Sequence, residues 1–263
     1  MNTILVPVDF SIYSEHAIDV AFQIAKAKGV SVHLLHCVEK GESHQDTDTK
    51  LSDYTTQATA LGIQVQSFIE EGSRAHKVIT THAHSHQADL IIMGSHGLTP
   101  GDSQFIGSNA QRVVRHAPCP VFTIKNRQDQ FKIERIVYPS DFKYETDPMF
   151  NRVLDFANFF NAKIELVYVN TPSNFSDSQT IEKRIQSFLQ KQPNTISTIN
   201  IYNDFNNVDG ILNFSNHITS DMIAMTTLGK TGLHRFLDHS ITESIVNFSE
   251  KPVLTLCFSE LNG

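Results

Sequence analysis

The seven residues Ile4-Leu5-Val6-Pro7-Val8-Asp9-Phe10 return 132 residues later as Ile136-Val137-Tyr138-Pro139-Ser140-Asp141-Phe142. The same offset relates further pairs across a whole half of the chain: Ala25 and Ala157, Asp89 and Asp221, Met93 and Met225, Gly97 and Gly229, Pro120-Val121 and Pro252-Val253. One constant spacing over so long a stretch indicates an internal duplication. The sequence therefore predicts two domains of one fold, residues 1–126 and 133–263, joined through the polar residues near 126–130.

Each half alternates short apolar runs with stretches whose apolar residues recur at helical spacing. In the first half we expect strands over residues 3–8, 30–38, 63–69, 89–93 and 121–125, and helices over 15–28, 46–61, 75–86 and 109–116. Such alternation predicts parallel strands with crossover helices, hence an α/β fold of two doubly wound parallel-sheet sandwich domains. Ligands of such sheets bind beyond the carboxyl ends of the strands, so the loops after the first and fourth strands are the places to examine.

Composition narrows the function classes. The 263 residues are 40% hydrophobic and 19% charged, which is typical of a folded chain. A net charge of -7 argues against binding nucleic acid or an anionic membrane surface, because both need clustered Lys and Arg. The sequence has neither a run of about 18 apolar residues nor a secretion signal at its start. With three widely spaced cysteines, these features predict a cytoplasmic protein in a reducing compartment.

The loop after the fourth strand carries three spaced glycines, Gly94, Gly97 and Gly107, and a helix is predicted to follow them. A glycine lets a backbone N–H approach a phosphate with no Cβ in the way. The free N–H groups and dipole of the following helix favour an anion, and Ser108 at the helix start can cap it and donate a hydroxyl. On these grounds alone, phosphate binding and a plain turn are equally good interpretations.

Three segments in order, "ILVPVDFS" (residues 4–11), "DLIIMGSHG…GS" (89–108) and "CPVFTIK" (119–125), resemble the universal stress protein family. The resemblance covers both halves and implies a tandem member with an adenine nucleotide α-hydrolase-like fold. In the family, the spaced-glycine motif marks the members that bind ATP, so the resemblance implies one ATP site in the first half.

Carried over by position, the motif residues divide between the two ends of the nucleotide. Val8 and Asp9 would line the adenine, and Val38 would meet it through the backbone. Gly94 would approach the ribose, and Met93 beside it belongs to the same set of nucleotide-binding residues. The residues around the phosphates would be His96, Gly97, Gly107, Ser108 and Asn109. Asp102 departs from the usual pattern of this loop, and a carboxylate beside a triphosphate implies a bridging divalent cation such as Mg²⁺ or Mn²⁺.

The second half has lost two of the three motif glycines, at Thr226 and His239. Side chains there would crowd the path of a phosphate, so we expect this half not to bind ATP in the family manner. Asp141 keeps only a local role in this interpretation. Gly229-Lys230-Thr231 resembles the end of a P-loop, but Ala224 stands where the first glycine is required, which argues against a Walker site.

His82, His84 and His86 alternate along a predicted helix, and His82 and His86 are spaced for one helix face. Two zinc ligands are conceivable there. Structural zinc sites normally need four ligands, however, and no further ligand pattern accompanies these residues. We therefore expect a partly exposed, polar helix end.

The last strands of the two halves, Val121-Phe122-Thr123-Ile124-Lys125 and Val253-Leu254-Thr255-Leu256-Cys257, bear on assembly. Members of the family commonly dimerise by pairing these strands, so the resemblance implies an intrachain pseudo-dimer and leaves a homodimer of whole chains open. A stress-response role through nucleotide-dependent sensing or interaction is the leading hypothesis. Slow ATP hydrolysis and a nucleotide-free interaction module are the alternatives.

Overall fold

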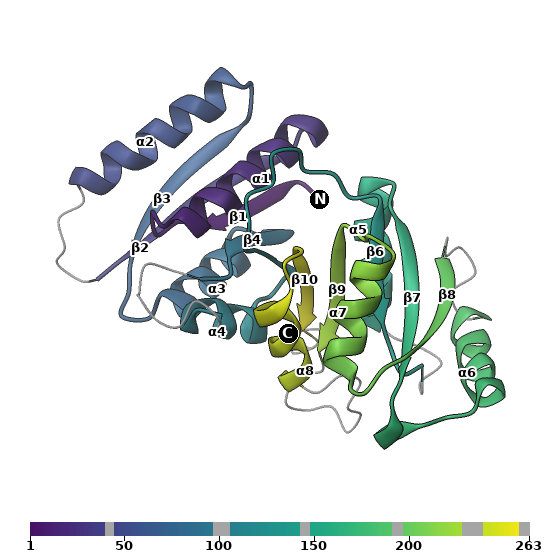
Figure 1. The fold of residues 1–263 in the computed structure, drawn as a ribbon. Coiled ribbons are helices and arrows are strands. Elements are labelled where there is room, and N and C mark those ends of the chain that lie inside the picture. The colour runs from purple at the N-terminus through teal and green to yellow at the C-terminus, as the bar shows by residue number, and fades with distance from the viewer. Residues whose placement is uncertain (40–44, 97–105, 143–147, 191–196, 228–238, 258–263) are drawn as a thin grey trace. The chain divides into compact units, whose positions relative to one another are not determined.

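The computed structural model describes residues 1–39, 45–96, 106–142, 148–190, 197–227 and 239–257. The chain forms two compact units, the first holding Met1–Phe131 and the second beginning at Lys132. Both units alternate strands and helices along the chain, as Figure 1 shows. The α/β class expected from the sequence is confirmed.

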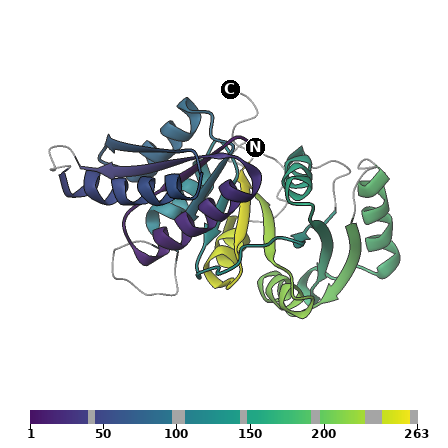
Figure 2. The same cartoon turned by 90° about the horizontal axis from the view of Figure 1, so that it is seen from above.

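The first unit is a parallel sheet covered on both faces. Its elements are β1 Thr3–Pro7, α1 Ile12–Lys28, β2 Ser31–Val38, α2 Gln45–Ala60, β3 Val65–Glu71, α3 Ala75–Ser85, β4 Leu90–Gly94, α4 Ser108–His116 and β5 Val121–Ile124. The strand order is β3-β2-β1-β4-β5, and every pair is parallel. Figures 1 and 2 show α1 and α2 on one face of this sheet and α3 and α4 on the other. The order reverses between β1 and β4, which places the switch point between the two loops singled out above.

The second unit repeats this plan. Its elements are β6 Arg135–Pro139, α5 Pro148–Phe160, β7 Lys163–Asn170, the short 3-10 helix η1 Pro172–Asn174, α6 Ser178–Gln190, β8 Ser197–Asn203, α7 Asn207–His217, β9 Met222–Thr227, α8 His239–Phe248 and β10 Val253–Cys257. Its strands run in the order β10-β9-β6-β7-β8, all parallel. β9 therefore takes the place of β4, and β6 the place of β1.

Strand burial explains why the sheets form. In β1, Ile4, Leu5 and Val6 have no exposed surface, and every residue of β4 is buried. Strands buried on both faces read as continuous apolar runs, which is how they stand out in the sequence. None of the helices in the described part of the chain is long and apolar enough to span a membrane.

Helix boundaries differ from the expected ones where a local cap decides them. α1 begins at Ile12, ahead of the expected residue 15, because Ser11 caps it by accepting a hydrogen bond from the Ser14 amide. The helix ends at Gly29, whose φ of 71° lies in the left-handed region. The second boundary follows the expected glycine signal, whereas the first depends on a serine that the apolar spacing alone did not reveal.

Candidate functional site

The first corner of the candidate site follows β1. The Asp9 carboxylate accepts hydrogen bonds from the Ser11 amide at 3.0 Å and from the Ser11 hydroxyl at 2.6 Å. Ser11 in turn caps α1. Asp9 therefore has a local structural role, because it holds the residue that starts the helix. This is the capping interpretation of Asp9, and a ligand role would be additional to it.

Phe10 stands between Asp9 and Ser11 with a φ of 60°, a conformation that a bulky residue rarely adopts. Its ring lies against His36 of β2, with ring centroids 4.7 Å apart. The ammonium of Lys50 on α2 lies 5.0 Å from the centroid of the same ring. His36 is held by Val8, whose carbonyl oxygen lies 2.7 Å from Nδ1. A left-handed backbone at a bulky residue is strained and persists only where its surroundings determine it.

The second corner follows β4, where Gly94 lies directly against α1. A Cβ added to Gly94 would come within 2.7 to 2.9 Å of the Cβ, carbonyl carbon and carbonyl oxygen of Tyr13. Two of these are backbone atoms, so they have little freedom to move away. Gly94 is thus required by the close approach of helix and strand, in addition to any role toward a ligand.

His96 lies next to the same helix. Its ring packs on Tyr13 with centroids 4.9 Å apart, and its Nδ1 is 2.8 Å from the Ser95 hydroxyl. Tyr13 therefore lies against both Gly94 and His96, yet sequence reasoning missed it. Its place two residues beyond Ser11, in the first turn of α1, is a signal that could have identified it.

The far end of the glycine loop returns to β4. The Gly107 amide donates a 2.8 Å hydrogen bond to the Ser95 carbonyl oxygen, so the residues before α4 lie beside the end of the strand. The N-cap of α4 is Gly107, with no side-chain hydrogen bond at that cap, so the expectation that Ser108 caps the helix is wrong. Ser108 and Asn109 are exposed in the first turn. An uncapped helix start leaves backbone N–H groups that an anion can accept from.

The sequence-derived site residues thus gather at one edge of the sheet. Val8 and Asp9 follow β1, Val38 ends β2, and Met93 and Gly94 end β4, three neighbouring strands of the sheet. His96, Gly107, Ser108 and Asn109 join them through the Ser95–Gly107 hydrogen bond. Gly97 and Asp102 lie outside the described residues.

Cys37, one residue before Val38, has the wrong chemistry for a nucleophile. Burial, with the nearby Glu70 carboxylate, raises the pKa of its thiol to about 12. A thiol with such a pKa is almost wholly protonated at neutral pH and therefore unreactive. Cys37 is therefore not suited to act as a nucleophile at this edge of the sheet.

In the second half, side chains occupy the corresponding edge. Phe142, the counterpart of Phe10, has a φ of 48° but is only 2% exposed. Its ring packs on Phe188 of α6 with centroids 5.3 Å apart. Thr226, the counterpart of Gly94, lies with its hydroxyl 3.1 Å from the Tyr138 hydroxyl.

Asn170, the counterpart of Val38, adds to this filling. Its side chain bonds the Ser176 backbone at both N–H and carbonyl, and reaches the Asn203 side chain at 3.3 Å. It therefore ties the chain after β7 to the end of β8. The side chain of His239 and the Gly229-Lys230-Thr231 stretch lie outside what the structure describes.

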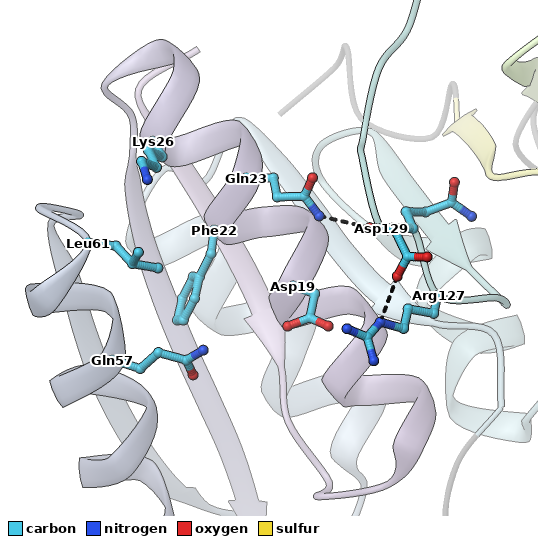
Figure 3. Close-up of a pocket in the computed structure, with 9 residues that line it drawn as sticks. Asp19, Phe22, Gln23, Lys26, Gln57, Leu61, Arg127 and Asp129 are labelled. Carbon is cyan, nitrogen blue, oxygen red and sulfur yellow. Dashed lines mark hydrogen bonds and ion pairs between the residues drawn. The ribbon is translucent and has the colours of Figure 1, made fainter.

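A pocket of about 300 Å³ lies elsewhere in the first unit, between α1, α2 and the chain that follows β5. Figure 3 shows Gln23 reaching that chain and Arg127 paired with Asp129. Gln23 donates to the Gln128 carbonyl and accepts from the Phe131 amide, at 2.9 and 2.7 Å. The pocket is lined by residues of α1, by the C-terminal end of α2 and by the chain after β5, and not by the strand ends, so we interpret it as the groove in which the chain leaving the first unit is held.

The histidine series of α3 differs from expectation in one member. His84 and His86 are exposed, as expected of a polar helix end, but the His82 side chain has no exposed surface. The interpretation as a partly exposed helix end is therefore wrong for His82. Within the described ranges, no three His, Cys, Asp or Glu side chains are placed to hold a metal ion.

Comparisons with known proteins agree on one family. The model of the universal stress protein family matches residues 1–125 and again residues 132–256. A universal stress protein of Thermus aquaticus is 32% identical over 135 residues, covering 47% of this chain and 98% of that protein. A putative universal stress protein of Staphylococcus aureus is 27% identical over 142 residues, covering 48% of this chain and 86% of its own length.

Two solved structures match nearly the whole chain in fold. A universal stress protein from Archaeoglobus fulgidus superposes with a TM-score of 0.75 at 17% identity, covering 97% of this chain and 98% of its own. A putative universal stress protein from Pseudomonas aeruginosa superposes with a TM-score of 0.71 at 20% identity, covering 98% and 93%. At these identities the likeness concerns the fold.

Proposed function

The chain belongs to the universal stress protein family, in two copies, and from this premise we propose that its first half binds one molecule of ATP. The observation that carries the proposal is the return of Gly107 to Ser95, which sets the uncapped start of α4 beside the end of β4. A helix start at the switch point of the sheet can bind a phosphate through backbone N–H groups, without a basic side chain. The acidic net charge of the chain is compatible with such a site, because the anion is bound by amides.

The proposed contacts follow the strand ends. The adenine lies at Val8, Asp9 and Val38, and the ribose at Met93 and Gly94. The phosphates lie at His96, Gly97, Gly107, Ser108 and Asn109. Asp102 is proposed to share a Mg²⁺ or Mn²⁺ ion with the phosphates, since an unshared carboxylate would repel them.

The second half is proposed to bind no nucleotide in this manner. Phe142 and Phe188 are buried where Phe10 and exposed Thr56 stand in the first half, and the Asn170 side chain takes the place of Val38. A ligand entering there would have to displace packed aromatic rings. One site per chain is the consequence.

We assign the protein a role in the stress response, inside the cytoplasm, through nucleotide-dependent sensing or interaction. In this mechanism the bound nucleotide contacts the loop between Gly94 and Ser108 and favours one state of a partner or assembly equilibrium. The shift can be no larger than the difference in nucleotide affinity between the two states.

The proposal is tested at Ser108, which is exposed and lies in the first turn of α4. Ser108→Glu suits the helix, because a negative charge near the N-terminus stabilises it, but places a carboxylate at the proposed phosphates. We expect Ser108→Glu to weaken binding of a fluorescent ATP analogue by at least about tenfold, a loss of about 1.4 kcal/mol. Ser108→Gln is the neutral control and should bind nearly as wild type does.

Three outcomes separate the alternatives. Absence of binding by the wild type, with and without Mg²⁺, would favour a nucleotide-free interaction module. Equal binding by Ser108→Glu and Ser108→Gln would move the site elsewhere. Release of phosphate or AMP above that of the Ser108→Glu control would add slow hydrolysis to the function.

We also propose that the two halves pair within the chain through Val121–Lys125 and Val253–Cys257, covering two sheet edges that would otherwise be open to aggregation. A scan of single cysteines at residues 121 to 125, with Cys37 and Cys119 replaced by Ala, tests this by disulfide formation with Cys257. A monomeric cross-linked product supports pairing within the chain. A covalent dimer would instead indicate that these strands pair between two copies.

A further inference from the structure

Three imidazole rings gather between β2 and α3 in the first unit, away from the strand ends discussed above. His33 comes from β2, His82 comes from α3, and His86 is the residue that follows α3 as its C-cap. The rings of His82 and His86 are stacked, with centroids 3.9 Å apart and an interplanar angle of 16°. The His33 ring stands edge-on to both, at 5.8 and 5.7 Å. Phe68 of β3 contacts all three rings, at 4.6 to 5.2 Å.

Hydrogen bonds assign the proton positions in this histidine cluster. His82 Nδ1 lies 2.5 Å from a carboxylate oxygen of Glu70, so Nδ1–H donates to Glu70. His86 Nδ1 lies 3.2 Å from the His82 carbonyl oxygen and donates to it. Within the described part of the chain, His82 Nε2 and His33 Nδ1 are buried and have no hydrogen-bond partner. His33 and His82 thus each have one ring nitrogen shielded from water, and the ring of His86 is stacked on that of His82.

The stacking excludes a shared metal ion as the purpose of these rings. An imidazole binds a metal in the plane of its ring, along the lone pair of one nitrogen. Two rings stacked nearly parallel direct their lone pairs side by side, so they do not converge on one ion. The remaining chemistry of the cluster is proton uptake near neutral pH.

The cluster can take one proton more easily than two. A charge on His82 would be paired with Glu70, the carboxylate that contacts this ring. A second charge on His86 or His33 would lie about 4 to 6 Å from the first, where like charges repel strongly in a partly buried setting. Burial first, and then His82 and His86, hold the pKa of His33 below its ordinary value of 6.5.

The other face of α3 adds to the same tendency. α4 packs on α3 and brings Arg112 and His116 toward His76, in the first turn of α3. Burial first, then these groups with Arg74 and Lys77, lowers the pKa of His76. The charged forms of His76 in α3 and of His33 in β2, which faces α3 through the ring contacts above, are therefore both disfavoured in the folded chain.

We propose that His33, His82 and His86 form an acid-sensitive latch, which holds α3 on the β2–β3 edge while the rings share at most one proton and releases it when a second ring is protonated. The sign follows from the lowered pKa of His33 and His76 in the folded chain. Below about pH 6.5 the open form binds more protons than the closed form, so acid favours opening. The contribution of the latch to stability is complete above that pH and is lost as the pH falls toward the lowered values.

Hydrogen exchange of the full chain, read by mass spectrometry at pH 7.5 and 5.5, tests the latch. Protection factors are corrected for the intrinsic exchange rate, and peptides from α3 are compared with peptides from β4. We expect α3 to lose protection relative to β4 on acidification, by up to tenfold per pH unit for each extra proton bound on opening. Equal changes in α3 and β4 would overturn the proposal.

Variants separate protonation from packing. His86→Gln removes the exposed member of the stack and should flatten the pH dependence, whereas His84→Gln, on the exposed face of the same helix, should leave it as in the wild type. Glu70→Gln removes the carboxylate whose negative charge stabilises the first protonated ring, so opening of α3 should begin at higher pH. A flattened profile in His84→Gln, or an unmoved midpoint in Glu70→Gln, would contradict the latch.

Discussion

The corners after β1 and β6 have the same backbone and opposite surroundings. Phe10 and Phe142 both adopt a left-handed φ, at 60° and 48°. Phe10 remains partly exposed between His36 and Lys50, whereas Phe142 is 2% exposed against Phe188. The duplication thus preserved a strained corner while replacing what covers it. The strained backbone is a property of the fold, whereas the side chains packed on each phenylalanine decide whether a ligand has room.

The side chains opposite the two phenylalanines explain the difference. At the offset of 132 residues, Tyr168 replaces His36, Phe188 replaces Thr56, and Phe150 replaces Ile18. Phe150 and Phe188 pack on each other with centroids 4.9 Å apart, and Tyr138 packs on Phe150 at the same distance. An aromatic core therefore extends to the strand ends in the second half and stops short of them in the first.

The largest difference in stability between the two corners is expected from Phe188→Ala. Phe188 is 1% exposed and contacts both Phe142 and Phe150, so its removal leaves a cavity beneath the corner. We expect a loss of about 3–5 kcal/mol in the free energy of unfolding of the second half, measured by urea denaturation. Thr56→Ala, at the exposed counterpart on α2, should change the stability of the first half by less than about 0.5 kcal/mol. Similar losses in the two variants would mean that both corners are filled alike.

A smaller effect is expected from exchanging the residues at the ends of β4 and β9. Gly94→Thr introduces a Cβ within 2.9 Å of the Tyr13 backbone, so α1 must shift. Overpacking of this kind costs about 1–3 kcal/mol, and the shift should also abolish binding of the ATP analogue. Thr226→Gly, the reverse change, removes the contact between the Thr226 and Tyr138 hydroxyls and should cost about 1 kcal/mol without creating a nucleotide site. Thermal unfolding and analogue titration measure the two effects, and unchanged binding in Gly94→Thr would contradict the proposed place of the ribose.

The sequence predicts the fold well where burial produces a simple pattern of apolar residues. β4 lies within one residue of its expected bounds because all its side chains are buried, and α1 ends where Gly29 predicts. The start of α1 was missed because it depends on Ser11, which Asp9 holds through two hydrogen bonds. Local apolar spacing contains no information about such a cap.

The candidate site was predictable in part for the same reason. The glycine motif is recognisable from residue type and spacing alone, so Gly94 and Gly107 could be predicted from the sequence. Contacts between distant segments were not, such as Phe10 with His36 across two strands, or Tyr13 with His96. The burial of His82 likewise depends on Phe68 and Glu70 of β3, which nothing in its own helix indicates.

The smallest effect on stability is expected from Lys50→Glu, which tests the difference in charge between the two corners. Glu182 stands at this position in the second half, so the exchange imports its charge without touching the core. Lys50 is exposed, and its contact with the Phe10 ring is worth about 0.5–1 kcal/mol at such a site. The free energy of unfolding should therefore fall by no more than that amount, whereas the negative charge near the strand ends should weaken ATP binding several-fold at low salt and less at high salt. Lys50→Met separates the two contributions, because it removes the cation without adding an anion. If Lys50→Glu binds the analogue as tightly as Lys50→Met at low salt, the nucleotide does not reach Phe10. The exposed surface around Phe10 must then serve a different ligand.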